Sequence, residues 1–91
     1  MHIAYQVVSV KNVRWLSENY FAADFQCENE HGHLLAEQKN VLCSKKGGPQ
    51  KYKENAEEVQ PEILETVQES PYYVYDEEKF WKMAQASMQE T

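Results

Sequence analysis

The segment from Tyr20 to Cys43 constrains the fold most, because apolar and polar residues alternate along it with a period of two. The apolar side holds Phe21, Ala23, Phe25 and Cys27, and the polar side holds Asp24, Gln26 and Glu28, with the small Ala22 among them. That period predicts a β-strand with one face against a core and the other in water. The Gly-containing stretch 29–33 then predicts a chain reversal, and residues 34–43 predict the returning strand.

The N-terminal stretch, residues 2–15, is rich in β-branched and aromatic residues, which favour strands. Its apolar alternation changes face between Val7 and Val8, which leaves open either a bulge or burial on both faces. Asn12 marks a weak break, and residues 17–19 mark a stronger one. We therefore expect an antiparallel meander of three or four strands over residues 2–43.

The chain changes character after Ser44. Residues 44–54 predict a loop with its hinge at residues 47–49 (Gly-Gly-Pro), and the loop carries four lysines, the only basic patch. From Glu54 to Glu78 the sequence holds nine acids and neither lysine nor arginine.

Helical spacing follows in the acidic part. Apolar residues recur there at steps of three to four, namely Tyr52, Ala56, Val59, Ile63 and Val67. Pro61 interrupts this stripe and suits the first turn of a helix, so we expect a helix over 61–69 and leave open a short one before it. Asp76 is a suitable N-cap for a last helix over 77–88, with Phe80 on its apolar face. The predicted fold class is α+β, with two helices within 55–88 packed on one face of the sheet.

Length and composition limit the function classes. Ninety-one residues predict one domain spanning 1–91, made of the sheet 2–43, the loop 44–54 and the acidic helical segment 55–88. A net charge of −6 disfavours direct nucleic-acid binding. The sequence shows neither a signal peptide nor a stretch of the roughly 20 apolar residues that cross a membrane, so we expect a cytoplasmic protein without membrane contact.

One cluster of metal-competent side chains exists, formed by Cys27, His31 and His33, with Cys43 further along. Such ligands suit zinc, but their spacing matches no standard zinc motif. In the predicted hairpin Cys27 lies opposite residues 35–36, which leaves Cys43 on the order of 23 Å away, too far for a disulfide. We expect a buried Cys27, histidines that belong to the turn, and no metal or other cofactor. A zinc-dependent regulator is a third hypothesis for function.

No catalytic motif is present, and no base is positioned beside a nucleophile, so the sequence does not predict an enzyme. The tyrosine segment 72–75, with the nearby Trp81, is the most unusual feature left. Tyrosines are enriched at protein interfaces, so the candidate partner-binding residues are Tyr72, Tyr73, Tyr75 and Trp81. The alternative is that these tyrosines pack on the sheet as an edge strand. A protein partner of unknown identity, or a second copy of the chain in a homodimer, would use the surface.

The acidic block supports two interpretations. It is either the solvated face of the helices or a band of carboxylates that imitates nucleic acid toward a basic host protein or nuclease. The candidate residues for the second are Glu54, Glu57, Glu58, Glu62, Glu65, Glu69, Asp76, Glu77 and Glu78.

A wider pattern begins at Val10 and runs through Trp15 and a Ser-Glu-Asn turn into the alternating strand that holds Phe25. With a later short apolar-Ser segment and Pro49, it resembles small bacteriophage and prophage proteins linked to tail-fibre genes, over residues 8–59. The resemblance implies a phage or prophage origin and a non-enzymatic role, and it brings no catalytic residues. We therefore expect a small protein-interaction or accessory module.

Overall fold

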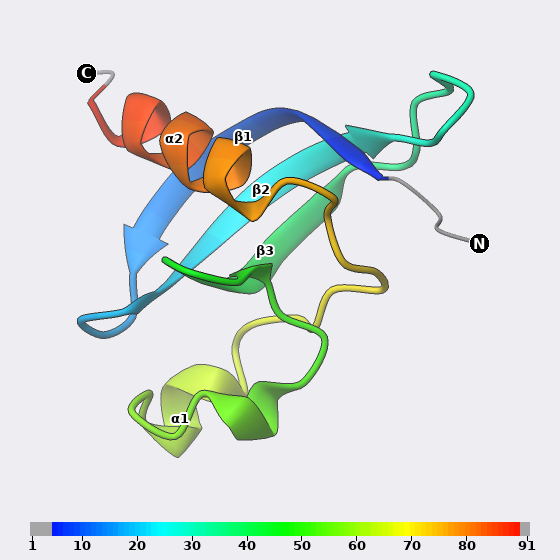
Figure 1. Ribbon diagram of the computed structural model, residues 1–91. Coiled ribbons are helices and arrows are strands. Elements are labelled where there is room, and N and C mark those ends of the chain that lie inside the picture. The colour runs from blue at the N-terminus through cyan, green and yellow to red at the C-terminus, as the bar shows by residue number, and fades with distance from the viewer. Residues whose placement is uncertain (1–4, 90–91) are drawn as a thin grey trace.

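The computed structural model describes residues 5–89, which form a four-stranded sheet, two short helical turns and one longer helix (Figure 1). The elements in chain order are β1 (Gln6–Trp15), β2 (Tyr20–Glu28), β3 (Gln38–Ser44), β4 (Gly48–Pro49), the 3₁₀ turn η1 (Lys53–Asn55), α1 (Pro61–Leu64) and α2 (Glu77–Met88). The strands are antiparallel and neighbours in chain order, so the predicted α+β class and the meander are confirmed. The predicted strand residues 2–4 lie outside the described part. Within residues 5–89, no helix combines the length and apolar character needed to cross a membrane.

Cys27 lies opposite Leu35 as predicted, but the β2–β3 pairing shifts register between Ala23 and Phe25, and the connection is longer. The Leu35 N–H donates to the Cys27 carbonyl at 2.9 Å, as the expected pairing required. Cys43 pairs with Phe21, six positions before Cys27 on the same strand, and both thiols are free. Strand β3 begins only at Gln38, because residues 29–37 form a loop.

The predicted loop over 44–54 is in part regular structure. Gly48 and Pro49 form the two-residue strand β4 and pair with Ser44 and Cys43. Gly48 has φ +64°, a left-handed conformation that suits glycine, and a Cβ there would meet the Val74 side chain at 3.4 Å. The glycine therefore allows both the tight turn into β4 and the close approach of the backbone to the Val74 side chain.

One face of the sheet, the front face, packs against α2. The buried cluster there takes residues of β1, alternate residues of β2 and β3, residue 74 and two residues of α2, namely Val7, Val10, Phe21, Ala23, Phe25, Cys27, Val41, Cys43, Val74, Phe80 and Ala84. The Phe80 ring lies 5.5 Å from the Phe25 ring, centroid to centroid, and is fully buried. Asp76 caps the helix by accepting from the Lys79 N–H at 3.0 Å, and α2 spans 77–88 as predicted.

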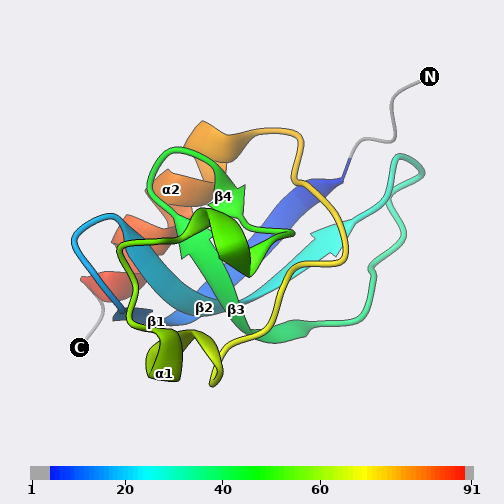
Figure 2. The ribbon, with the colours of Figure 1, turned by 90° about the horizontal axis from the view of Figure 1, so that it is seen from below.

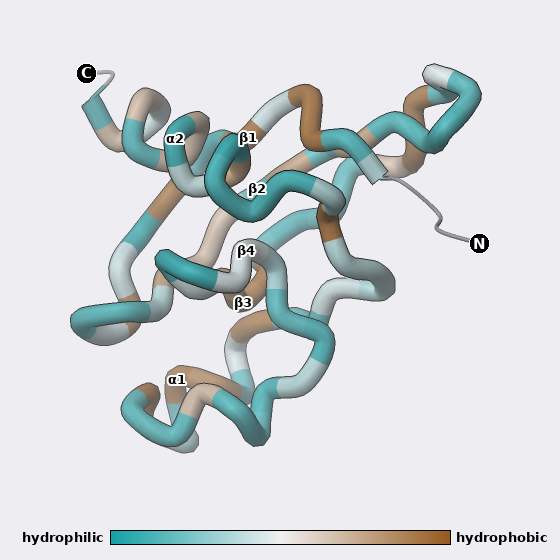
Figure 3. The backbone as a smooth tube through the Cα atoms, viewed as in Figure 1, coloured by the Kyte–Doolittle hydropathy of each residue, from teal (hydrophilic) through white to brown (hydrophobic). Residues whose placement is uncertain are grey.

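The other face of the sheet, the back face, holds a second cluster. Its buried members are Ala22, Leu42, Ala56, Val59 and Val67. Because side chains alternate along a strand, Ala22 and Leu42 point away from the front face. The segment 52–68, with α1, covers them, and Figures 1 and 2 show α1 and α2 on opposite sides of the sheet. The expectation that both helices share one face is therefore wrong. Figure 3 shows hydrophobic stretches both in α1 and in the strands above it.

Helix α1 ends five residues before the predicted Glu69. The Thr66 hydroxyl donates to the Ile63 carbonyl at 2.7 Å, which satisfies an acceptor at the end of the helix. The chain then extends beside β3: the Gln68 N–H donates to the Asn40 carbonyl at 2.8 Å, and the Leu42 N–H donates to the Gln68 carbonyl at 2.9 Å. Pairing with the sheet edge replaces the last helical turns.

Asp24 lies on the back face but is only 9% exposed, contrary to its predicted place in water. It accepts from the Asn12 side-chain amide at 2.7 Å and from the Asn40 N–H at 2.8 Å. Both asparagines have positive φ, 56° and 55°, and each lies at an irregularity in the strand pairing. Burial alone would raise the pKa of Asp24, but these two hydrogen bonds and the charges of Arg14 and Lys39 hold it below its usual value. Asp24 thus joins β2 to a bulge on either side.

Candidate protein-interaction surface

The tyrosine segment 72–75 alternates between core and solvent. Val74 is buried in the front cluster and Tyr72 is half-buried, whereas Tyr73 and Tyr75 are 58% and 70% exposed. The Tyr75 N–H donates to the Tyr5 carbonyl at 2.8 Å, which fixes the segment beside the start of β1. Along this short segment, side chains that pack in the core therefore alternate with side chains that face solvent.

Tyr72 is part of the packing. Its ring stacks on Tyr5 with centroids 4.2 Å apart and meets the Phe25 ring edge-on at 6.2 Å. Its hydroxyl is buried with no well-formed hydrogen bond in the described part of the chain, and the adjacent Cys27 thiol is a weak partner. Burial, together with the nearby Cys27, raises the pKa of Tyr72. A partner protein cannot reach this hydroxyl without disturbing the core.

Trp81 is also a packing residue. It is half-buried, with its ring 5.7 Å from Phe21 and 5.9 Å from Trp15 between centroids. Trp15 is 46% exposed and has the Lys45 ammonium 5.1 Å from its ring centroid. Of the four partner-binding candidates, only Tyr73 and Tyr75 present open rings to solvent.

Two chain segments meet beside Tyr73. The Ser70 N–H donates to the Gln50 carbonyl at 2.7 Å, so residues 50–53 lie next to residues 69–73. The Lys51 ammonium lies 5.2 Å from the centroid of the Tyr73 ring, a cation–π contact. Tyr52, the next residue, is 48% exposed, although it belongs to the apolar stripe whose spacing predicted a helix. We call the residues Lys51, Tyr73 and Tyr75 the tyrosine surface.

Three of the nine candidate acids hold the fold together. Glu58 accepts from the Ser17 hydroxyl at 2.6 Å and from the Asn19 N–H at 2.9 Å, and these hydrogen bonds lower its pKa. Glu69 accepts from a backbone N–H of η1, and Asp76 caps α2. These three carboxylates have intramolecular roles that the charge pattern did not reveal.

The other six acids lie in two places. Glu77 and Glu78 are in the first turn of α2, where a negative charge suits the helix dipole, and Glu78 pairs with Lys82 at 3.3 Å. The remaining four are exposed on the segment that covers the back face, and within residues 5–89 none of them forms an ion pair: Glu54, Glu57, Glu62 and Glu65.

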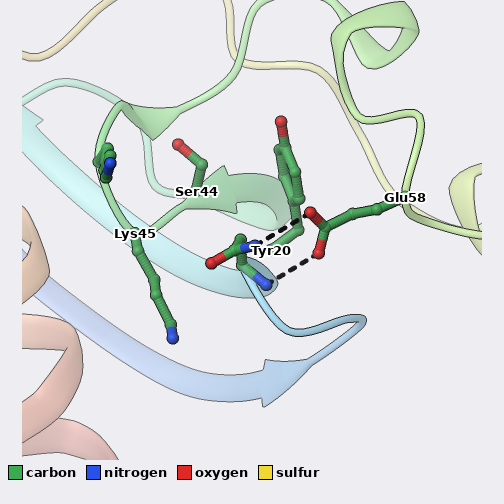
Figure 4. A pocket seen from close by; sticks show the side chains of 6 residues that line it. Tyr20, Ser44, Lys45 and Glu58 are labelled. Atoms are coloured by element: carbon green, nitrogen blue, oxygen red, sulfur yellow. Dashed lines mark hydrogen bonds between the residues drawn. The ribbon is translucent and has the colours of Figure 1, made fainter.

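A polar hollow of about 320 Å³ lies between the turn after β1 and the turn after β3, and Figure 4 shows its lining. The lining residues are Asn19, Tyr20, Ser44, Lys45, Lys46 and Glu58. Ser44 is its only aliphatic hydroxyl, and that oxygen accepts from the Gly47 N–H at 2.8 Å and from the Gln50 side chain at 3.2 Å. The hydroxyl stabilises the β3–β4 turn by accepting these two hydrogen bonds.

The metal candidates are not brought together. Cys27 is buried, and burial raises the pKa of its thiol to about 11, which disfavours the thiolate that binds zinc. His31 and His33 are exposed on the 29–37 loop, with ring centroids 6.3 Å apart. Within residues 5–89, no three side chains of the ligating types gather closely enough to hold an ion.

Comparison with known proteins returned no match, whether against family models, curated proteins or solved structures.

Proposed function

We propose that this chain is a small non-enzymatic protein-binding module that contacts its partner through the tyrosine surface. The observation that supports this most is the exposure of Tyr73 and Tyr75, residues that are 58% and 70% exposed while the neighbouring Tyr72 and Val74 pack in the core. Exposed tyrosines bring a large amphipathic contact area at a low cost in conformational entropy. The resemblance of residues 8–59 to small phage and prophage proteins supports an accessory role of this kind.

The test is affinity capture from the source cell with the double variant Tyr73→Ser/Tyr75→Ser. Both rings are exposed, so the variant is expected to unfold at the same temperature as the wild type and to lose the captured partner. Leu34→Ser is the matched control, because Leu34 is 63% exposed but lies in the 29–37 loop. Equal capture of the partner by the double variant and the wild type would contradict the proposal. It would also be contradicted if Leu34→Ser lost the partner to the same extent as the double variant.

A second candidate function is the acidic inhibitor that occupies a nucleic-acid site on a basic protein. It is supported by the four exposed glutamates on the segment that covers the back face, which form no ion pair within the described residues. Binding to a basic nuclease should then weaken steeply with salt and fall in the variant Glu57→Gln/Glu62→Gln. Salt-insensitive binding, or none, would remove this candidate.

A further inference from the structure

The outer edge of β1 is open. In the strand order β1-β2-β3-β4, the outer side of β3 is covered by β4 and by Gln68, whereas within residues 5–89 no strand lies beyond β1. Figure 1 shows β1 at the margin of the sheet. The hydrogen bond from the Tyr75 N–H reaches only the Tyr5 carbonyl, immediately before the strand begins. The unpaired N–H and C=O groups of such an edge can pair with an added strand.

A hollow of about 280 Å³ lies beside this edge, between β1 and α2. Its lining residues are Val8, Ser9, Val10, Met83, Ala86 and Ser87. The register shift between Val7 and Ser9 leaves Val8 without a partner on β2, as in a bulge. Val8 lines the hollow together with residues of α2, and it is 38% exposed. An apolar side chain from an added strand would cover Val8 there.

The back-face side of β1 is basic. Lys11 and Arg14 pair with Asp24 and Ala22 in the register, and β1 contains no acid. Lys11 already forms an ion pair with Glu37 at 3.1 Å. Arg14 donates to the Asn12 carbonyl at 2.9 Å, and within residues 5–89 it has no carboxylate in ion-pair contact.

The positive charges of Lys11 and Arg14 indicate which kind of strand can pair with the β1 edge. A second copy of β1 would bring further lysine and arginine side chains against the same ones, and like charges on neighbouring strands destabilise the pairing. A strand with acidic side chains at alternate positions would instead place one of them near the Arg14 guanidinium.

We propose that the β1 edge binds an extended segment of another protein in which apolar and acidic residues alternate. Its backbone pairs with the regular stretch Ser9–Lys11, between the two irregularities of β1. Its apolar side chains enter the hollow beside α2, and its acidic side chains face Arg14. This site is separate from the tyrosine surface and does not depend on it.

Two synthetic peptides serve as probes, Glu-Val-Glu-Ile-Glu-Val-Glu and its counterpart with lysine at every glutamate position. The glutamate peptide should bind the wild type and protect those amides within Ser9–Lys11 that point away from β2, as hydrogen exchange measured by NMR would show. The variant Arg14→Glu should reverse the preference, so that the lysine peptide binds better than the glutamate peptide.

The variant Ala86→Glu fills the hollow and should weaken binding of the glutamate peptide about tenfold or more. Gln85→Glu is the matched control, because it adds the same charge to α2 at an exposed position outside the hollow. The proposal is overturned if neither peptide binds, if protection appears away from β1, or if the two α2 variants behave alike. It is also overturned if the wild type is a dimer that Ala86→Glu dissociates, since a second copy would then occupy the edge. The variant Tyr73→Ser/Tyr75→Ser should bind the glutamate peptide like the wild type, which separates this test from that of the tyrosine surface.

Discussion

Truncating Leu42 to alanine removes an isopropyl group from the centre of the back-face cluster. Leu42 is fully buried among Ala22, Ala56, Val59 and Val67. The alanines have only a methyl group, which has no rotamer to change, and the valines are stiff at χ1, so these buried neighbours fill little of the space left behind. A Leu→Ala change of this kind costs about 3–5 kcal/mol when the cavity stays open.

That cost is a large share of the free energy of unfolding of the whole chain. A chain of this length is expected to have a free energy of unfolding of roughly 5–13 kcal/mol, so Leu42→Ala should lower the melting temperature by roughly 15–30 °C. The assay is urea unfolding followed by circular dichroism, with the midpoint lowered and the slope with denaturant unchanged.

Leu34→Ala is the control, because it is the same substitution at a side chain that is 63% exposed. We expect it to change the free energy of unfolding by no more than about 0.5 kcal/mol. If the two variants lose the same free energy within that margin, the segment 52–68 does not bury the back face.

Three further outcomes follow from individual contacts. The pKa of Asp24 is lower in the folded state than in the unfolded state, so its ionisation stabilises the fold above about pH 4, and this contribution is lost as the pH falls further. The melting temperature of Asp24→Asn should therefore depend less on pH in that range, and a pH dependence equal to that of the wild type would contradict this. The thiols of Cys27 and Cys43 are buried with raised pKa values, so iodoacetamide at pH 8 should label them slowly in the native protein and rapidly in urea, as mass spectrometry would show; fast native labelling would mean that the core is open. Glu58→Gln weakens the acceptor that holds the turn after β1, so the Asn19 amide should exchange faster by NMR while the strand amides do not change; no change at Asn19 would show that this contact is not formed.

The sequence was sufficient where one local rule decided the structure. The period-two alternation identified β2, and the strong N-cap Asp76 set the start of α2 at Glu77. Pro61 stands at the first turn of α1, as its missing N–H and fixed φ favour. The signal for each of these features lies within one element, so sequence reasoning could find it.

The sequence-based predictions were wrong where contacts between residues far apart in the chain determine the structure. Leu42 was assigned only to a returning strand, and nothing local shows that 52–68 would come to cover its face. Asp24 looked solvated because its two partners lie at bulges on the neighbouring strands, and bulge positions depend on pairing. The helix predicted over 61–69 was too long, because the edge of β3 competes for residues 66–68. Ala22 was the one available clue, since a small apolar residue on a polar face indicates close approach by another segment.

At the candidate site, too, part of the arrangement could be predicted from local sequence and part could not. Its composition indicated an interface, and the alternation of a strand-like stretch could have separated Tyr73 and Tyr75 from their inward neighbours. The role of Trp81 depends on its contacts with Phe21 and Trp15, which join three elements and cannot be inferred from spacing. Tyr52 fitted a helical period that the chain does not adopt, since its backbone is extended.

The claim that α2 and the 52–68 segment bury opposite faces of one sheet is tested most directly by a nuclear Overhauser spectrum of the full chain. The account predicts cross-peaks between the Phe80 and Phe25 rings, and separate cross-peaks from the Leu42 methyls to those of Val59 and Val67. A spectrum in which the Val59 and Val67 methyls instead contact Phe80, or contact no strand residue, would contradict it.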